Sequence, residues 1–133
     1  MTEEDRYICV RQFRQGIRQV TTEFCAGCIE CIDGVPEDIL SAAKRELLEE
    51  TGYGSDDWRH LLTVPSYAAL SDNYMSIFLA KNCQKINSRQ DLDEDEFLNV
   101  HLYSRDELEE KVKNGEFAQA AHILALLMAD QCV

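Results

Sequence analysis

The chain has 133 residues, of which 45% are hydrophobic, and its 25 Asp and Glu outnumber 13 Lys and Arg to give a formal net charge of −12. This length is typical of one domain with its own core, and the hydrophobic fraction excludes a disordered chain. The acidic balance argues against a nucleic-acid binder and against docking on an anionic membrane. A phosphate-bearing substrate stays open, because a bound divalent cation can invert the local field.

Two features of the sequence bear on location. No apolar run approaches the roughly 20 residues that cross a bilayer, and the acidic start Met1–Asp5 lacks the pattern of a signal peptide. We therefore expect a cytoplasmic protein whose six cysteines are reduced thiols.

The first elements in chain order are two strands joined by a turn. The residue pattern predicts a strand over 7–14, a turn at Gln15-Gly16 and a second strand over 18–25. A loop with a turn at Asp33-Gly34 follows over 28–36.

The strongest helix signal covers 37–51. Apolar residues recur there at helical spacing, at Ile39, Leu40, Ala43 and Leu47. Gly52 follows where a C-terminal cap is expected.

The second half of the chain alternates strands and helices. The pattern predicts strands over 58–64 and 74–80, an acidic loop over 87–96 and a further strand over 97–103. A helix is predicted from the capping-box residue Ser104 to about 113, and a last helix over 117–129. Because there is little βαβ alternation, we expect an α+β fold. It would form one α/β/α sandwich with a mixed β-sheet over residues 1–133.

Three glutamates of the central helix share one side of it. Glu46, Glu49 and Glu50 are spaced by three and four residues, so their like charges repel. Such a cluster of hard oxygen ligands suits Mg²⁺ or Mn²⁺. The alternative is a solvated acidic helix face, which is common.

The spacing around these glutamates resembles the signature of the Nudix hydrolase family, Gx5Ex7REUxEExGU, in which U is a bulky apolar residue. The matching residues are Glu37, Arg45, Glu46, Leu47, Glu49, Glu50, Gly52 and Tyr53. The opening glycine of the signature is replaced by Cys31, and Ala26-Gly27 lies four residues too early. We therefore expect a loop four residues longer than is usual in the family.

Other segments resemble the ADP-ribose pyrophosphatase branch of this family. They are Arg11–Arg14, Glu23–Gly27 and the acidic stretch 93–96. Full-length members of the branch begin with a small sheet that swaps between subunits. This chain starts almost at the first core strand, and we expect that it lacks this sheet. The resemblance leaves open whether the chain pairs with a second copy of itself to form a homodimer.

The resemblance implies Mg²⁺-dependent hydrolysis of a nucleoside diphosphate linked to another moiety, with ADP-ribose cut to AMP and ribose 5-phosphate. It implies Glu46, Glu50 and Glu49 as metal ligands, joined by the backbone carbonyl of Ala26. Arg45 would orient a signature glutamate through a charge-assisted hydrogen bond.

The same resemblance implies that the late acidic loop supplies the general base. We expect Glu94 in this role, with Glu96 as the alternative or as a further metal ligand, and a solvated acidic turn as the competing interpretation. Gly27, Glu37 and Gly52 would have structural roles within the motif.

Nucleotide or ribose contacts are expected from Arg11, Arg14 and Glu23, although these residues could instead pair across strands. The remaining alternatives for function are another nucleotide sugar, a dinucleotide or a nucleoside triphosphate as substrate. A non-catalytic module that binds a nucleotide sugar is the alternative from another class.

The cysteines and histidines are assigned no role at this point. Cys25, Cys28 and Cys31 have a C-x2-C-x2-C spacing, but a metal–thiolate site lacks a fourth ligand at a fitting distance. Ordinary small residues are the preferred interpretation, with Cys28 and Cys31 sensitive to oxidation if they are exposed. The three histidines fall in separate predicted elements.

Overall fold

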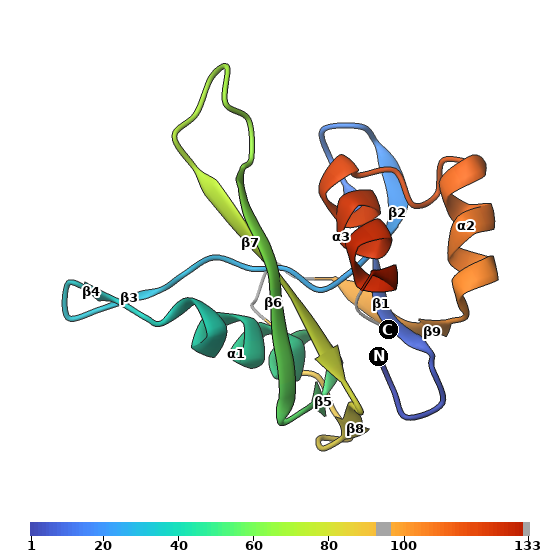
Figure 1. Ribbon diagram of the computed structural model, residues 1–133, viewed down its shortest axis with the longest axis horizontal. Helices are drawn as coiled ribbons and strands as arrows, with labels where there is room; N and C mark the ends of the chain where they lie inside the picture. The colour runs from blue at the N-terminus through green and yellow to red at the C-terminus, as the bar shows by residue number, and fades with distance from the viewer. Residues whose placement is uncertain (93–96, 132–133) are drawn as a thin grey trace.

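The computed structural model describes residues 1–92 and 97–131 (Figure 1). Three helices cover α1 Ile39–Thr51, α2 Arg105–Lys113 and α3 Ala120–Asp130. The longer strands are β1 Tyr7–Arg14, β2 Gln19–Glu23, β6 Asp57–Pro65, β7 Tyr74–Lys81 and β9 Leu98–Tyr103. The two-residue strands are β3 Cys31–Ile32, β4 Val35–Pro36, β5 Tyr53–Gly54 and β8 Gln84–Lys85.

Strand β1 is the centre of the fold. It pairs antiparallel with β2 on one edge and β9 on the other, so that Val10 lies between Glu23 and Val100. Cys9 and Val10 are fully buried because both faces of β1 are covered. The β6–β7 pair forms a separate antiparallel ribbon, and a parallel bridge from Thr2 to Cys83 joins the two parts.

Helices cover the two sides of β1 (Figure 1). On the side of α2 and α3, one core cluster packs Tyr7 and Cys9 against Leu108, Phe117 and Leu126. On the side of α1, a second cluster joins Ile8, Leu47 and Cys83. This arrangement is the predicted sandwich, with the glutamate-bearing helix α1 in a layer of its own.

Helix α1 begins at Ile39, two residues later than predicted. The Asp38 carboxylate accepts from the Ser41 N–H at 3.0 Å, which makes Asp38 the N-cap. Gly52 ends the helix as predicted, in the left-handed region at φ +70°, and its N–H donates to the Leu48 carbonyl at 2.7 Å.

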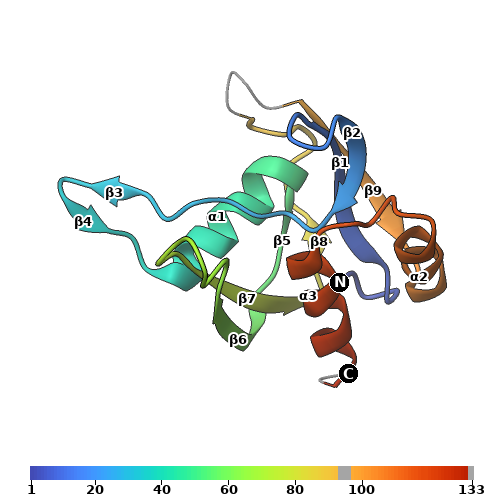
Figure 2. The ribbon, with the colours of Figure 1, turned by 90° about the horizontal axis from the view of Figure 1, so that it is seen from above.

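The predicted loop over 28–36 contains a short hairpin of β3 and β4, with Asp33 and Gly34 at its turn in left-handed conformations. An extended segment over 24–30 leads to it from β2, runs along α1 and ends in the projecting hairpin (Figure 2). Helix α3 begins three residues later than predicted, because Phe117 is instead buried in the core.

Strands β5 and β8 were not predicted, since two-residue strands carry almost no periodic pattern. In residues 1–92 and 97–131, no helix combines the length and the apolar character that crossing a bilayer requires.

Candidate active site

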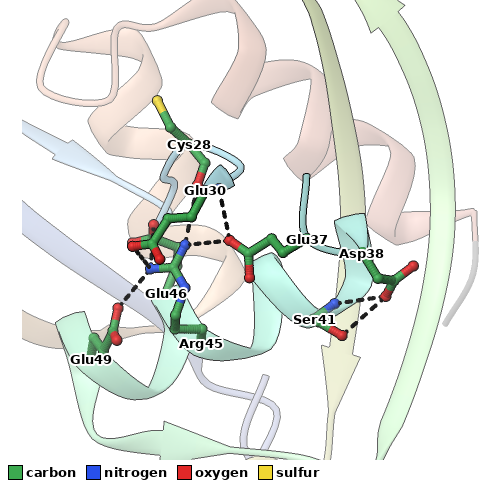
Figure 3. A network of polar contacts seen from close by, with 8 residues as sticks. All are labelled: Cys28, Glu30, Glu37, Asp38, Ser41, Arg45, Glu46 and Glu49. Carbon is green, nitrogen blue, oxygen red and sulfur yellow. Dashed lines mark hydrogen bonds and ion pairs between the residues drawn. The ribbon is translucent and has the colours of Figure 1, made fainter. Parts of the chain in front are cut away.

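Arg45 is the centre of a polar network on α1 (Figure 3). Its guanidinium donates to Glu37 at 2.7 Å, to Glu49 at 2.9 Å and to Glu46 at 3.0 Å. These bonds raise the pKa of Arg45, with Glu37 contributing most. The arginine is therefore a fixed cation that sets the orientation of three signature carboxylates.

Arg45 also ties α1 to the segment that precedes the hairpin. It donates to the backbone carbonyl of Cys28 at 3.1 Å and forms an ion pair with Glu30 at 3.5 Å. Sequence reasoning missed Glu30, which lies in the loop before α1. The only available signal was a carboxylate nine residues before the first helical residue, Ile39, and that spacing is not diagnostic.

Glu30 and Glu37 close the hairpin between them. The Glu37 N–H donates to the Glu30 carbonyl at 2.9 Å, and the Glu30 N–H donates to the Glu37 carboxylate at 3.0 Å. The hydrogen bond from Arg45 lowers the pKa of Glu37, helped by this backbone donor. Glu37 thus holds the base of the β3–β4 hairpin against Arg45.

Glu46 and Glu50 face the segment over 25–27. A Cβ atom added at Gly27 would lie 1.9 Å from the Glu46 carboxylate, so the carboxylate occupies the space that a side chain would fill. Glu50 is buried, with 2% of its surface exposed. Burial, and after it the charges of Glu50 and Glu46, raise the pKa of the Cys25 thiol well above its usual range. Both carboxylates therefore lie close to the segment that contains Ala26.

The expected metal ligands do not form a ready-made metal centre. In the part of the chain that the structure describes, no three side chains of His, Cys, Asp or Glu are arranged to hold a metal ion. Glu46 and Glu49 are instead both bonded to Arg45. The three cysteines of the C-x2-C-x2-C motif are likewise free thiols.

The loop that leads to residues 93–96 is fastened to the end of α1. The Asp91 N–H donates to the Glu49 carbonyl at 2.9 Å, and the Gln90 side chain donates to the Glu50 carbonyl at 2.6 Å. Glu94 and Glu96, the expected base and its alternative, lie outside the described residues.

Two of the expected substrate contacts pair with each other. The Arg14 guanidinium donates to both oxygens of Glu23, at 2.8 and 2.5 Å, and Thr21 donates to the same carboxylate. Burial acts to raise the pKa of Glu23, but these hydrogen bonds outweigh it and hold the pKa below its ordinary value. Glu23 is only 1% exposed, whereas 41% of the Arg14 side chain is open to solvent. Arg11 lies on β1 opposite Thr22 and Asn99.

A cavity of about 700 Å³ adjoins the carboxylates. Its walls are the segment over 24–29, the inner face of α1, the β6–β7 ribbon and α3. Within the described residues, Glu46 is the one Asp, Glu, Lys or Arg that lines it, and most of the lining is apolar. A volume of roughly 300–1,000 Å³ is typical of pockets for small molecules.

This fold and this motif define the class of the protein: a model of the NUDIX domain matches residues 1–126, and the chain belongs to that family. Curated relatives include the methanol dehydrogenase activator of Bacillus methanolicus, 28% identical, and the ADP-ribose pyrophosphatase of Bacillus subtilis (strain 168), 29% identical. Each alignment runs over 126 residues and covers 95% of this chain and 66% of the relative.

The fold is also similar to that of a solved protein. A crystal structure of an ADP compounds hydrolase matches with a TM-score of 0.81 and 25% identity. The match covers 97% of this chain and 66% of that one. This chain thus spans slightly less than two thirds of the length of these relatives, and the α+β Nudix fold expected from its sequence is confirmed.

Proposed function

We propose that this chain is a metal-dependent Nudix pyrophosphohydrolase that cuts the pyrophosphate bond of a nucleoside diphosphate linked to another moiety, ADP-ribose above all. The observation that carries the proposal is the convergence of Glu46 and Glu50 on the segment over 25–27, where Gly27 leaves room for a carboxylate. The printed names of the Bacillus subtilis relative and of the solved hydrolase support the substrate class.

The donor chemistry of these residues suits Mg²⁺ or Mn²⁺, although their present side-chain arrangement in the described residues does not form a metal site. The donor set would be the carboxylates of Glu46, Glu50 and Glu49 with the carbonyl of Ala26, all of them hard oxygen atoms that these cations prefer. When bound, the cation would neutralise phosphate charge and lower the pKa of a water molecule. It would also offset the repulsion between the glutamates, which destabilises the helix when no cation is bound.

Arg45 is proposed as the positioning residue. It donates to Glu46 and Glu49, and its separate contact with Glu37 would keep it anchored if those two carboxylates held a cation. The chain of contacts from Glu37 through Arg45 to Glu46 fixes the rotamers on which ligand geometry depends.

Glu94 is proposed as the general base, with Glu96 as the alternative. The described part of their loop supports this, because Asp91 is bonded to the backbone of Glu49.

Two further features are proposed as substrate contacts, the apolar cavity and Arg14. The apolar cavity suits the uncharged part of a substrate whose phosphates lie near Glu46. The partly exposed Arg14 side chain would contact the substrate. Glu23 would not touch the substrate itself but would hold the Arg14 guanidinium in position.

A second candidate rests on the other relative. The printed name of the Bacillus methanolicus protein is that of an activator of another enzyme, and its identity to this chain is nearly the same. A Nudix module that acts on a partner protein, with or without turnover of its own, is therefore the alternative.

Product analysis tests the proposal. The protein would be incubated with Mg²⁺ and, in turn, ADP-ribose, GDP-mannose, a dinucleotide and nucleoside triphosphates, beside Glu50→Gln and the matched control Glu110→Gln on the exposed face of α2. We expect AMP and ribose 5-phosphate from ADP-ribose with the parent and the control. Glu50→Gln should be slower by at least about 100-fold, as for loss of a group that acts in the transition state.

Two other outcomes of the product analysis would change the proposal. Turnover of a different substrate alone would replace ADP-ribose and keep the reaction. Ligand binding without turnover of any of these compounds would contradict hydrolysis and favour the partner module.

A further inference from the structure

Two cysteines of the C-x2-C-x2-C motif differ from the other described cysteines. Cys28 and Cys31 are exposed free thiols. Cys9 and Cys83 are buried, and burial raises the pKa of Cys9 to about 12. Reagents in solution therefore reach Cys28 and Cys31 first.

The backbone holds these two thiols apart. Residues 24–30 contain no turn or bend, and Cys31 begins strand β3. Three residues of extended chain separate their Cα atoms by roughly 10 Å, whereas a disulfide needs about 4.4–6.8 Å. A bond between them therefore requires the segment to fold into a tight turn.

That turn is incompatible with contacts on which the arginine network depends. Glu30, between the two cysteines, exchanges two backbone-linked hydrogen bonds with Glu37 at 2.9 and 3.0 Å. The Cys28 carbonyl accepts from Arg45 at 3.1 Å (Figure 3). Drawing Cys31 toward Cys28 reorients the peptide units of both Cys28 and Glu30.

We propose that Cys28 and Cys31 are a dithiol–disulfide modification site whose closure withdraws the Cys28 carbonyl from Arg45 and loosens the arginine's hold on the signature glutamates. The oxidant is a small disulfide of the glutathione class. One cysteine sulfur attacks it, forming a mixed disulfide and releasing one small thiol. The second cysteine sulfur then displaces the second small thiol. Two electrons and two protons leave with the two thiols.

Disulfide formation that breaks the hydrogen bond from Arg45 to the Cys28 carbonyl must overcome the free energy of that bond. Removing Arg45 should therefore raise the equilibrium constant for disulfide formation by the factor that this free energy represents. Loss of one charge-assisted hydrogen bond corresponds to a change of about tenfold in the equilibrium constant.

The test equilibrates the full chain with graded ratios of reduced to oxidised glutathione, followed by alkylation of the remaining thiols and peptide mass mapping. We expect a Cys28–Cys31 bond as the main product, reversed by excess thiol. In Arg45→Ala the equilibrium constant should shift about tenfold toward the disulfide. Glu37→Gln, which weakens the same network, should shift it in the same direction if Arg45→Ala does not fold.

Two results would overturn the proposal. One is a pattern in which Cys28 and Cys31 carry separate glutathione adducts or pair with other cysteines instead of each other. The second is an equal equilibrium constant in the folded variants and the parent.

Loss of activity on oxidation rests on the proposed function, whereas bond mapping and the exchange equilibrium do not. If the reduced protein hydrolyses substrate, we expect about a tenfold loss of rate in the disulfide form, recovery with thiol and no loss in Cys31→Ser. Full activity in the disulfide form would refute the loosening of the site. A reduced protein without activity would refute only the proposed hydrolysis.

Discussion

Gly27 and Glu46 meet where the extended segment passes α1, at a separation that no other residue type at position 27 permits. The Glu46 carboxylate fills the place of the missing Cβ. In the proposed metal site, this close approach would let the backbone of the 25–27 segment join the carboxylates as a ligand. A glycine in this role serves close approach rather than a turn, because its φ is not positive.

The Gly27→Ala substitution should weaken metal binding and activity by roughly 10–100-fold, the range for a displaced support of a metal ligand. The fold should survive, because the displaced group is the mobile end of a side chain. Titration of Mg²⁺ into the hydrolysis assay measures the effect. Gly16→Ala is the matched control, since no atom lies within 4 Å of its added Cβ. Equal loss in both variants would show that the contact has no part in the site.

Single residues also show where sequence reasoning reaches its limit. The spacing of the motif placed Glu46, Glu49 and Glu50 on one side of a helix, and α1 has them there because helical periodicity is local. The pairing of Arg14 with Glu23 depends on the register of two strands, and the Glu30 contact depends on the β3–β4 hairpin that brings Glu30 beside Glu37. The sequence left cross-strand pairing open as an alternative for Arg14 and Glu23, and the structure shows that pair, whereas nothing in the spacing indicated the Glu30 contact.

At the scale of elements, the start of α1 depends on one carboxylate. Asp38 accepts from both the N–H and the hydroxyl of Ser41, at 3.0 and 3.1 Å. Asp38→Ala should lower the free energy of unfolding by about 1 kcal/mol, as is typical of a lost N-cap. Urea unfolding measures this, with Asp72→Ala in an exposed loop as control. A difference below about 0.3 kcal/mol between the two variants would contradict the capping role.

Helix α3 is joined to the end of β2 by a buried histidine. The Phe24 N–H donates to Nδ1 of His122 at 3.1 Å, which requires an imidazole without a proton on that atom. Burial lowers the pKa of His122 below 6.5, and the charge of Glu23 opposes this only in part. Sequence reasoning assigned this histidine no role, because the contact joins residues 98 positions apart.

The sign of the resulting pH dependence follows from that lowered pKa. Below pH 6.5, His122 binds a proton in the unfolded chain but stays neutral in the folded chain. As the pH is lowered from 6.5 to the folded pKa, the free energy of unfolding therefore decreases, and above pH 6.5 His122 contributes no pH dependence. Between pH 7 and 5 the free energy of unfolding should lose at most about 1.4 kcal/mol per pH unit through this group. His122→Gln should lose that slope, and the exposed His60→Gln should keep it. An unchanged slope in His122→Gln would assign the pH dependence to other groups.

For the whole molecule, the fold class followed from the order of helices and strands, and the long elements were predicted nearly in place. What failed were features set by distant contacts. The two-residue strands β5 and β8 exist only because Tyr53 meets Lys85 across the fold, and the hairpin β3–β4 exists because Glu37 meets Glu30. The cavity beside Glu46 arises where α1, α3 and the β6–β7 ribbon face one another, which no local pattern encodes.

The net charge of −12 also belongs to this scale. A chain so acidic repels a diphosphate unless cations intervene, so the whole account depends on metal at α1. Titration of Mn²⁺ followed by electron paramagnetic resonance tests this most directly, with the parent, Glu50→Gln and Glu110→Gln compared at one ionic strength. The account predicts a site that Glu50→Gln weakens at least about tenfold and that Glu110→Gln leaves unchanged. Equal Mn²⁺ affinity in all three proteins would contradict it.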